Sequence, residues 1–192
     1  MNALHNPASN VDATRAFLLS LLQESRERFL SSFAGVTEEQ ARVRPAPDRW
    51  SVLDTVEHLT AAETLMVRIV TTQRVSRTVD APNREEILLL RAADRSRKWD
   101  APESAVPKGR FASLAEAAAK FAASRDEIIR FVEQSSEDLR ATEVTHPHAT
   151  VGVVSTCEML IIMAKHAERH AAQIEEIRSA LGLSAEAAQG QG

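Results

Sequence analysis

The segment Ser155-Thr-Cys-Glu-Met-Leu-Ile-Ile-Met-Ala-Lys-His-Ala-Glu-Arg-His-Ala-Ala-Gln-Ile174 determines most of the fold prediction. It opens with a capping box, in which Ser155 and Glu158 can satisfy each other's free backbone N–H groups at a helix start. Apolar residues then recur in steps of four and three, the spacing of one helix face. Gly182 is a natural end for that helix. The segment therefore predicts a long helix with one buried stripe, made of Met163, Ala167, His170, Ile174, Ile177 and Leu181.

Three further long helices follow from the same start signals and apolar spacing. They are predicted from after Asp12 to about Phe33, from Ser51 to about Arg74, and from Ser113 onward. Shorter helical turns are expected at 37–44 and 82–90, and proline, glycine and polar residues predict loops at 100–109 and 135–154. Four amphipathic helices with inward stripes pack as a bundle. The prediction is an all-α four-helix bundle with extra short helices in its connections.

Length and composition are consistent with a single globular domain. The chain has 192 residues, which is enough for a proper core without disulfides. Six Gly and no Tyr argue against an all-β architecture. We expect one domain over residues 1–183 and a frayed C-terminal tail, rich in Ala, Gln and Gly, over residues 184–192.

Charge and cysteine usage exclude several classes of function. A net charge of −4 provides no general electrostatic reason to bind nucleic acid. No apolar run is long enough for a bilayer, and the N-terminus lacks the pattern of a signal peptide, so we expect a cytoplasmic protein with no membrane partner. The single Cys157 precludes an internal disulfide. We expect it to pack as a small buried hydrophobic residue.

Three histidines carry the chemical prediction. His166 and His170 are four residues apart on the last helix, so both imidazoles project from one face and can share a metal ion. His58, in Trp50-Ser-Val-Leu-Asp-Thr-Val-Glu-His-Leu59, occupies an inward-facing position of a different helix. Three imidazoles of this kind would leave a coordination position open. The alternative is that they lie apart and serve only the packing of a helical bundle.

Residues near these histidines are candidates for orienting them. Metal-bound imidazoles usually donate their second N–H group to an acceptor, and Asp54 and Gln173 are each about one turn from a histidine. Asp54 has an equal alternative role at the positive end of the helix dipole. Glu57, next to His58, is a third candidate, but a solvated surface charge is the more common role for such a residue, and that is the role we expect. His146 and His148 flank a proline in a loop, where exposure is the commoner state, although they could approach the mouth of the site.

These segments resemble the DinB-like (DinB/YfiT) superfamily of small four-helix metalloproteins. The resemblance rests on Arg49-Trp-Ser-Val-Leu-Asp-Thr-Val-Glu-His-Leu59 and on Lys165-His-Ala-Glu-Arg-His-Ala-Ala-Gln-Ile174. It implies an up-down-down-up topology, for which the stretch 76–112 would be the crossover between parallel helices. It also implies a metal triad of His58, His166 and His170 with zinc, nickel or a similar divalent ion. Some members of the superfamily are thiol-dependent transferases or isomerases that use bacillithiol or mycothiol.

Three functions remain open at this point. The first is a metal-dependent enzyme in which the three-His site activates water or a thiol for transfer to, or hydrolysis of, a small molecule, with a low-molecular-weight thiol as an optional partner. The second is a non-catalytic metal-binding or stress-response bundle, and the third is a metal-free interaction module. Three imidazoles suit zinc, nickel, iron and copper alike, so the metal is left open. A homodimer through the apolar residues 87–90 is also left open.

Overall fold

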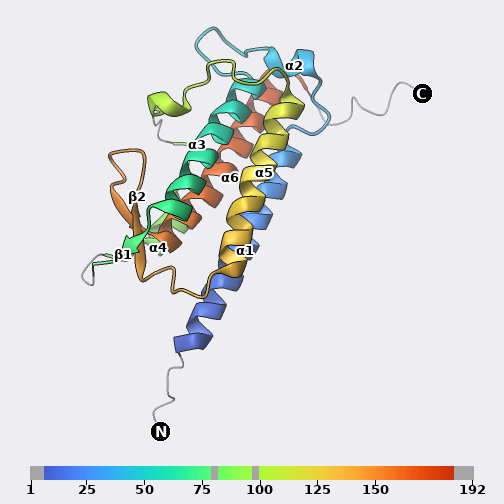
Figure 1. Cartoon of the computed structure of the whole chain (residues 1–192). Helices are drawn as coiled ribbons and strands as arrows, with labels where there is room; N and C mark the ends of the chain where they lie inside the picture. Colours follow the sequence, from blue (N-terminus) through green and yellow to red (C-terminus); the bar gives the residue numbers. More distant parts are fainter. Residues whose placement is uncertain (1–6, 79–81, 97–99, 184–192) are drawn as a thin grey trace.

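The computed structural model describes residues 7–78, 82–96 and 100–183, so the expected frayed tail 184–192 lies outside the described residues. Four long helices dominate it (Figure 1). They are α1 (Pro7–Ser32), α3 (Val52–Thr72), α5 (Leu114–Gln134) and α6 (Thr156–Ala180). The predicted all-α four-helix bundle is therefore confirmed.

The bundle has the up-down-down-up topology that the family resemblance implies. In Figure 1, α1 and α6 run upward along the chain, whereas α3 and α5 run downward. Each long helix packs against two others: α1 against α6 and α5, and α3 against α5 and α6. Because α3 and α5 are parallel neighbours, the chain from 73 to 113 must return along the outside of the bundle before α5 can begin.

Three of the four long helices begin at the predicted caps. Complete capping boxes form at Ser51 for α3 and at Ser155 for α6. Ser113 caps α5, but the carboxylate of Glu116 accepts from the backbone of Ala112 instead of closing a reciprocal box. The first helix begins earlier than predicted, at Pro7 and not after Asp12, since proline is well tolerated in the first turn of a helix.

The interior has two apolar regions separated along each helix by polar residues. One includes Leu18, Val67, Ile128 and Leu160, and the other includes Phe29, Leu59, Phe121 and Ile174, all of them buried. Between them on their helices lie Ser25, Glu63, Arg125 and His166. Arg125 and Glu63 form an ion pair with no exposed side-chain surface. The middle of the bundle is therefore polar, and His166 of α6 lies in this part.

The connections contain structure that the sequence prediction does not include. Strands β1 (Val75–Ser76), β2 (Thr142–Thr145) and β3 (Val153–Ser155) form an antiparallel sheet in the order β1-β2-β3, with Val144 opposite Val154. The prediction of an irregular loop over 135–154 is thus wrong for the hairpin. Short helices are α2 (Glu38–Arg42), α4 (Glu85–Arg91) and the 3-10 turn η1 (Glu103–Ala105), which lies inside the predicted 100–109 loop.

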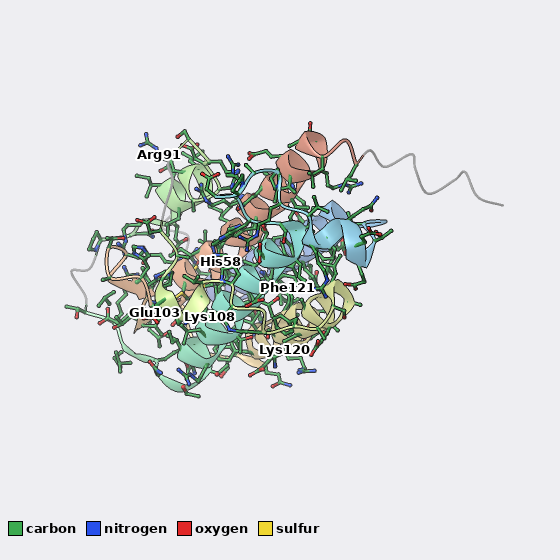
Figure 2. All side chains as sticks on the ribbon, turned by 90° about the horizontal axis from the view of Figure 1, so that it is seen from above. His58, Arg91, Glu103, Lys108, Lys120 and Phe121 are labelled. Carbon is green, nitrogen blue, oxygen red and sulfur yellow. The ribbon has the colours of Figure 1, made fainter. Side chains whose placement is uncertain are left out.

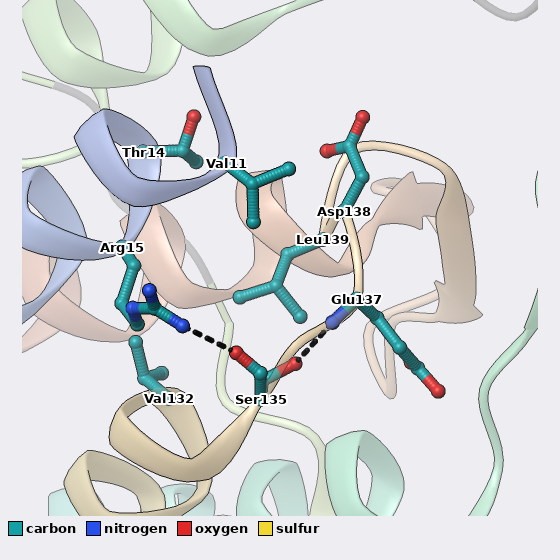
Figure 3. A pocket seen from close by; sticks show the side chains of 8 residues that line it. All are labelled: Val11, Thr14, Arg15, Val132, Ser135, Glu137, Asp138 and Leu139. Atoms are coloured by element: carbon teal, nitrogen blue, oxygen red, sulfur yellow. Dashed lines mark hydrogen bonds between the residues drawn. The ribbon is translucent and has the colours of Figure 1, made fainter. Parts of the chain in front are cut away.

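Two further features concern surfaces and cavities. Among the described residues, no helix combines the length and the apolar character needed to cross a bilayer. A cavity of about 10 Å³ lies where the start of α1 meets the chain after α5 (Figure 3). It is lined by Val11, Thr14, Arg15, Val132, Ser135, Glu137, Asp138 and Leu139. This volume holds about one water molecule, so it is too small for a substrate.

Candidate metal centre

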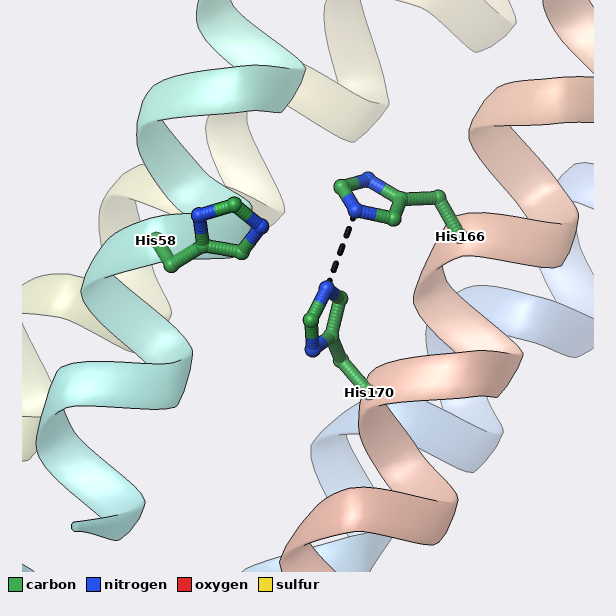
Figure 4. Close-up of side chains that lie close together, drawn as sticks. All are labelled: His58, His166 and His170. Atoms are coloured by element: carbon green, nitrogen blue, oxygen red, sulfur yellow. Dashed lines mark hydrogen bonds between the residues drawn. The ribbon is translucent and has the colours of Figure 1, made fainter. Parts of the chain in front are cut away.

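His58, His166 and His170 converge on one point between α3 and α6. One ring nitrogen from each lies within 4.8 Å of the others, and Figure 4 shows the three rings turned toward a common centre. His58 and His170 are buried, with 5% and 6% of their surface exposed, whereas His166 is half-buried. The alternative in which these histidines lie apart does not describe this structure.

The pair on α6 has the geometry that its spacing predicts. One helical turn places the imidazoles of His166 and His170 side by side, with their Nε2 atoms 2.9 Å apart. His58 approaches from α3, and its ring centroid lies 4.7 Å from that of His170. Three imidazoles from two helices therefore surround one small volume.

Hydrogen bonds determine which ring nitrogen carries the proton in His58 and in His170. The Nδ1 atom of His58 lies 2.8 Å from the carbonyl oxygen of Ala105, and that of His170 lies 2.9 Å from Oε1 of Gln173. Both partners are oxygen acceptors, so each Nδ1 atom carries the proton and donates it. The Nε2 atoms of His58 and His170 then carry lone pairs, which is the form that binds a metal. In this structure the Nε2 lone pair of His170 accepts the Nε2–H group of His166, 2.9 Å away.

This donor set fits a divalent cation. Imidazole nitrogens bind zinc at about 2.1 Å, which places ligand atoms about 3.4 Å apart in tetrahedral geometry. The three ring nitrogens lie within 4.8 Å of one another, so the rings would have to close in by up to about 1.4 Å to share one ion. In addition, Nδ1 of His166 is buried without a hydrogen-bond partner within the described protein. Such a ring is costly in a purely structural cluster, because a buried polar atom without a partner is destabilising.

Electrostatics keep the three rings neutral. Burial holds the pKa of His166 and of His170 well below the ordinary value of 6.5, and the neighbouring imidazoles lower both further. Burial also lowers the pKa of His58, against the opposing effect of its hydrogen bond to Ala105. A neutral imidazole is the metal-binding form, so no ring has to lose a positive charge near neutral pH. Binding through Nε2 of His166 would require its proton to move to Nδ1 of the same ring.

Gln173 and Asp54, two of the predicted orienting residues, have different positions. Gln173 contacts His170 as described above. Asp54 instead accepts a hydrogen bond from the backbone of Ser51, at 3.0 Å, and pairs with Arg44, also at 3.0 Å. The contacts of Asp54 are therefore those of a helix-start residue. The acceptor on His58 is the backbone carbonyl of Ala105, which carries no side-chain signal in the sequence.

The histidines of the β2–β3 hairpin stand outside the cluster. Nδ1 of His146 accepts a hydrogen bond from the backbone N–H of His148, and Nδ1 of His148 contacts the hydroxyl of Thr150. Neither residue belongs to the group of mutually close ligand atoms in the described chain. A positive charge on His146 would lower the pKa of His166 further. Burial lowers the pKa of His146 itself to about 4.

Glu57 differs most from its prediction. It is 2% exposed, so the expectation of a solvated surface charge is wrong. Its carboxylate accepts hydrogen bonds from three consecutive backbone N–H groups, those of residues 108–110. Burial of this charge is possible because those donors and a guanidinium replace its water. Sequence patterning identifies no such partner, since backbone groups have no residue type.

Comparisons with known proteins agree with this fold. A sequence model described as the DinB superfamily matches residues 21–174. The uncharacterized protein YuaE of Bacillus subtilis is 24% identical over an alignment of 164 residues, which covers 83% of this chain and 96% of YuaE.

Two solved structures share the architecture at low sequence identity. One is YfiT from Bacillus subtilis, with a TM-score of 0.59, 16% identity and coverage of 88% of this chain and 89% of YfiT. YfiT is described as a probable metal-dependent hydrolase with an unusual four-helix bundle topology. The other is a conserved protein from Enterococcus faecalis, with a TM-score of 0.58, 20% identity and coverage of 87% and 96%. At these identities the likeness concerns the fold.

Proposed function

This chain belongs to the DinB superfamily, and from that premise we propose that it is a metal-dependent enzyme acting on a small molecule. The proposed ligands are His58, His166 and His170. The observation that carries the proposal is the fixed tautomer of two buried rings. Acceptors at their Nδ1 atoms leave the Nε2 lone pairs of His58 and His170 directed into one volume, beside the ring of His166. A purely structural role does not require this arrangement.

A divalent cation held there would supply Lewis-acid activation of a water molecule or a thiol. The protein's own part is to hold three neutral donors on two rigid helices and to keep the surroundings dry. His58 and His170 are almost fully buried, and the Trp50 ring packs 4.8 Å from that of His58. Three protein ligands leave at least one position for the reacting molecule, which is the arrangement of catalytic rather than structural zinc sites.

Hydrolysis is the reaction to assay first. The description of YfiT as a probable metal-dependent hydrolase belongs to that protein, but the shared fold makes the same chemistry a reasonable start. Transfer of a thiol to an electrophile is the second reaction, and it requires a thiol from outside the chain. The single Cys157 is fully buried, and burial raises its pKa to about 12, so it is unsuited to act as the nucleophile.

Metal content tests the proposal. We expect purified protein to bind about one zinc or nickel ion per chain, and the His170→Ala variant to bind none. The matched control is His148→Ala, which removes a histidine outside the cluster. Equal metal content in the wild type and His170→Ala would eliminate the proposed site. The activity of the metal-loaded wild type is then compared with that of the His170→Ala variant on small ester, amide and thiol-acceptor substrates.

A further inference from the structure

The segment from Pro102 to Arg110 forms a strap across the outside of α3. It contains η1, and Ala105 at the end of this turn is 2% exposed. Figure 2 shows the labelled strap residues Glu103 and Lys108 beside α3, on the side of His58. The carbonyl of Ala105 accepts the Nδ1–H proton of His58, 2.8 Å away. The strap thus supplies the group that sets the tautomer of one proposed ligand.

A single side chain of α3 holds the far end of the strap. Oε1 of Glu57 accepts the N–H of Lys108 at 2.6 Å, and Oε2 accepts the N–H groups of Gly109 and Arg110, each at 3.1 Å. Consecutive N–H groups that point into one concavity form an anion-binding nest. Gly109 makes this nest possible, because its φ of +72° lies in the left-handed region, which other residues rarely adopt.

The guanidinium of Arg110 closes the strap on itself. Its Nη1 donates to Oε1 of Glu57 at 2.7 Å and to the carbonyl of Val106 at 2.9 Å. Its Nη2 donates to the carbonyl of Ser104 at 3.1 Å. The backbone on both sides of Ala105 is therefore connected to the Glu57 carboxylate through one rigid planar group.

We propose that Glu57 is a positioning residue of the three-histidine site. It acts through the strap: its carboxylate holds residues 108–110, the strap holds the Ala105 carbonyl, and that carbonyl fixes the His58 ring with Nε2 free. Glu57 and His58 are consecutive residues of α3, so the same helix presents both the ligand and the anchor of the group that orients it. The inference rests on the proposed metal site, but its first link, the orientation of His58, exists without metal.

If Glu57 had a purely structural role, a different result would be expected. Its loss would then lower the stability of the whole fold, as would the loss of any buried carboxylate that accepts backbone hydrogen bonds. Glu158 is such a group: it has no exposed side-chain surface and accepts the N–H groups of Ser155 and Arg84. It has no contact with the strap among the hydrogen bonds and ion pairs of the described residues. Glu158→Gln is therefore the matched control.

The experiment compares wild type, Glu57→Gln, Gly109→Ala and Glu158→Gln by two measurements. Nitrogen-15 NMR of the imidazoles reports the protonated Nδ1 atom of His58 in metal-free protein, and competition with a chelator gives the zinc affinity. Gly109→Ala should open the nest by changing the backbone alone. A Cβ atom at position 109 meets nothing within 4 Å, so it causes no clash, but the positive φ is strained for alanine. This variant keeps the test decisive if Glu57→Gln fails to fold.

We expect Glu57→Gln and Gly109→Ala to lose the single His58 tautomer and to bind zinc about 10- to 100-fold more weakly. Glu158→Gln should retain the tautomer and an affinity close to that of the wild type. An unchanged His58 signal and affinity in Glu57→Gln would overturn the inference, as would equal losses in Glu158→Gln. Failure of the wild type to bind metal would instead overturn the proposed function, while the NMR comparison would still decide the role of Glu57.

Discussion

Nδ1 of His170 lies 2.9 Å from Oε1 of Gln173, and Nη1 of Arg95 donates to the same oxygen at 3.3 Å. A guanidinium can only donate, so the contact with Arg95 identifies this atom as the amide oxygen and not the nitrogen. Arg95 is itself held by a bidentate contact with Glu176, both distances being 2.7 Å. The segment that follows α4 therefore stabilises the residue that orients His170, as the strap does for His58.

Gln173 should tune metal affinity without being a ligand. Gln173→Ala removes the acceptor that keeps the proton on Nδ1 of His170, so we expect zinc binding to weaken about 10-fold. Gln173→Glu retains an acceptor and adds negative charge, which makes the imidazole more basic, so its affinity should equal or exceed that of the wild type. Chelator competition measures both. Gln134→Ala, at the exposed end of α5, is the control for amide loss. If Gln173→Ala binds zinc as tightly as this control, Gln173 has no such role.

The Glu63–Arg125 pair makes a second prediction, about stability. Nε of Arg125 lies 2.7 Å from Oε1 of Glu63, and neither side chain is exposed. Glu63→Gln leaves the guanidinium buried without a counter-charge, so we expect a loss of about 3–5 kcal/mol in the free energy of unfolding. The double variant Glu63→Leu, Arg125→Met removes both charges and should lose much less. Urea unfolding compares them, and equal losses in the single and double variants would contradict this account.

The fold was predictable from sequence where its signals are local. The start signals at Ser51 and Ser155 and the apolar spacing of each long helix depend on residues within one or two turns. The β2–β3 hairpin was not predictable in this way. Its strands are short, and they are stabilised by pairing such as Val144 with Val154 and by the packing of those two buried side chains. Such stabilisation depends on context more than on intrinsic propensity.

The candidate site shows the same division between features that were predictable from local sequence and features that were not. The proximity of His166 and His170 follows from one helical turn, and that of His58 follows once α3 and α6 are neighbours. The acceptor on His58 has no signal, because any residue at position 105 offers the same carbonyl. The buried state of Glu57 is equally hidden, since its partners are mainly backbone N–H groups. A glycine near the end of the 100–109 loop was the one available indication of a backbone nest.

The contact between α4 and the rest of the bundle should depend on pH. Glu85 pairs with Arg140 through two contacts of 2.6 and 2.8 Å, and this hydrogen bonding lowers the pKa of Glu85 below its ordinary value of 4.5. A carboxylate with a lowered pKa stabilises the fold above the unfolded-state value, and this contribution is lost as the pH falls through the folded-state value.

We therefore expect Glu85→Gln to destabilise the protein by about 1–2 kcal/mol near neutral pH. The difference from the wild type should begin to shrink as the pH falls below 4.5, and it should disappear once the pH is below the lowered folded-state pKa, where the native wild-type carboxyl is also protonated. Urea unfolding of both proteins at a series of pH values from about 7 downward measures this. Glu86→Gln, on the same helix but outside this contact, is the control. A difference that stays constant over the whole pH series would show that the pair acts through packing and not through charge.

Cys157 should be inert in the folded protein. It is fully buried near the start of α6, and burial, assisted by the charge of Glu85, raises its pKa to about 12. Because the thiolate is the reactive form, we expect iodoacetamide to modify native protein at about pH 8 at least about 1,000-fold more slowly than protein unfolded in urea. Mass spectrometry follows the reaction, with Cys157→Ser as the blank for other sites. Rapid modification of native protein would mean that this thiol is accessible. Cys157 would then become a candidate nucleophile, in place of the water or external thiol of the proposed function.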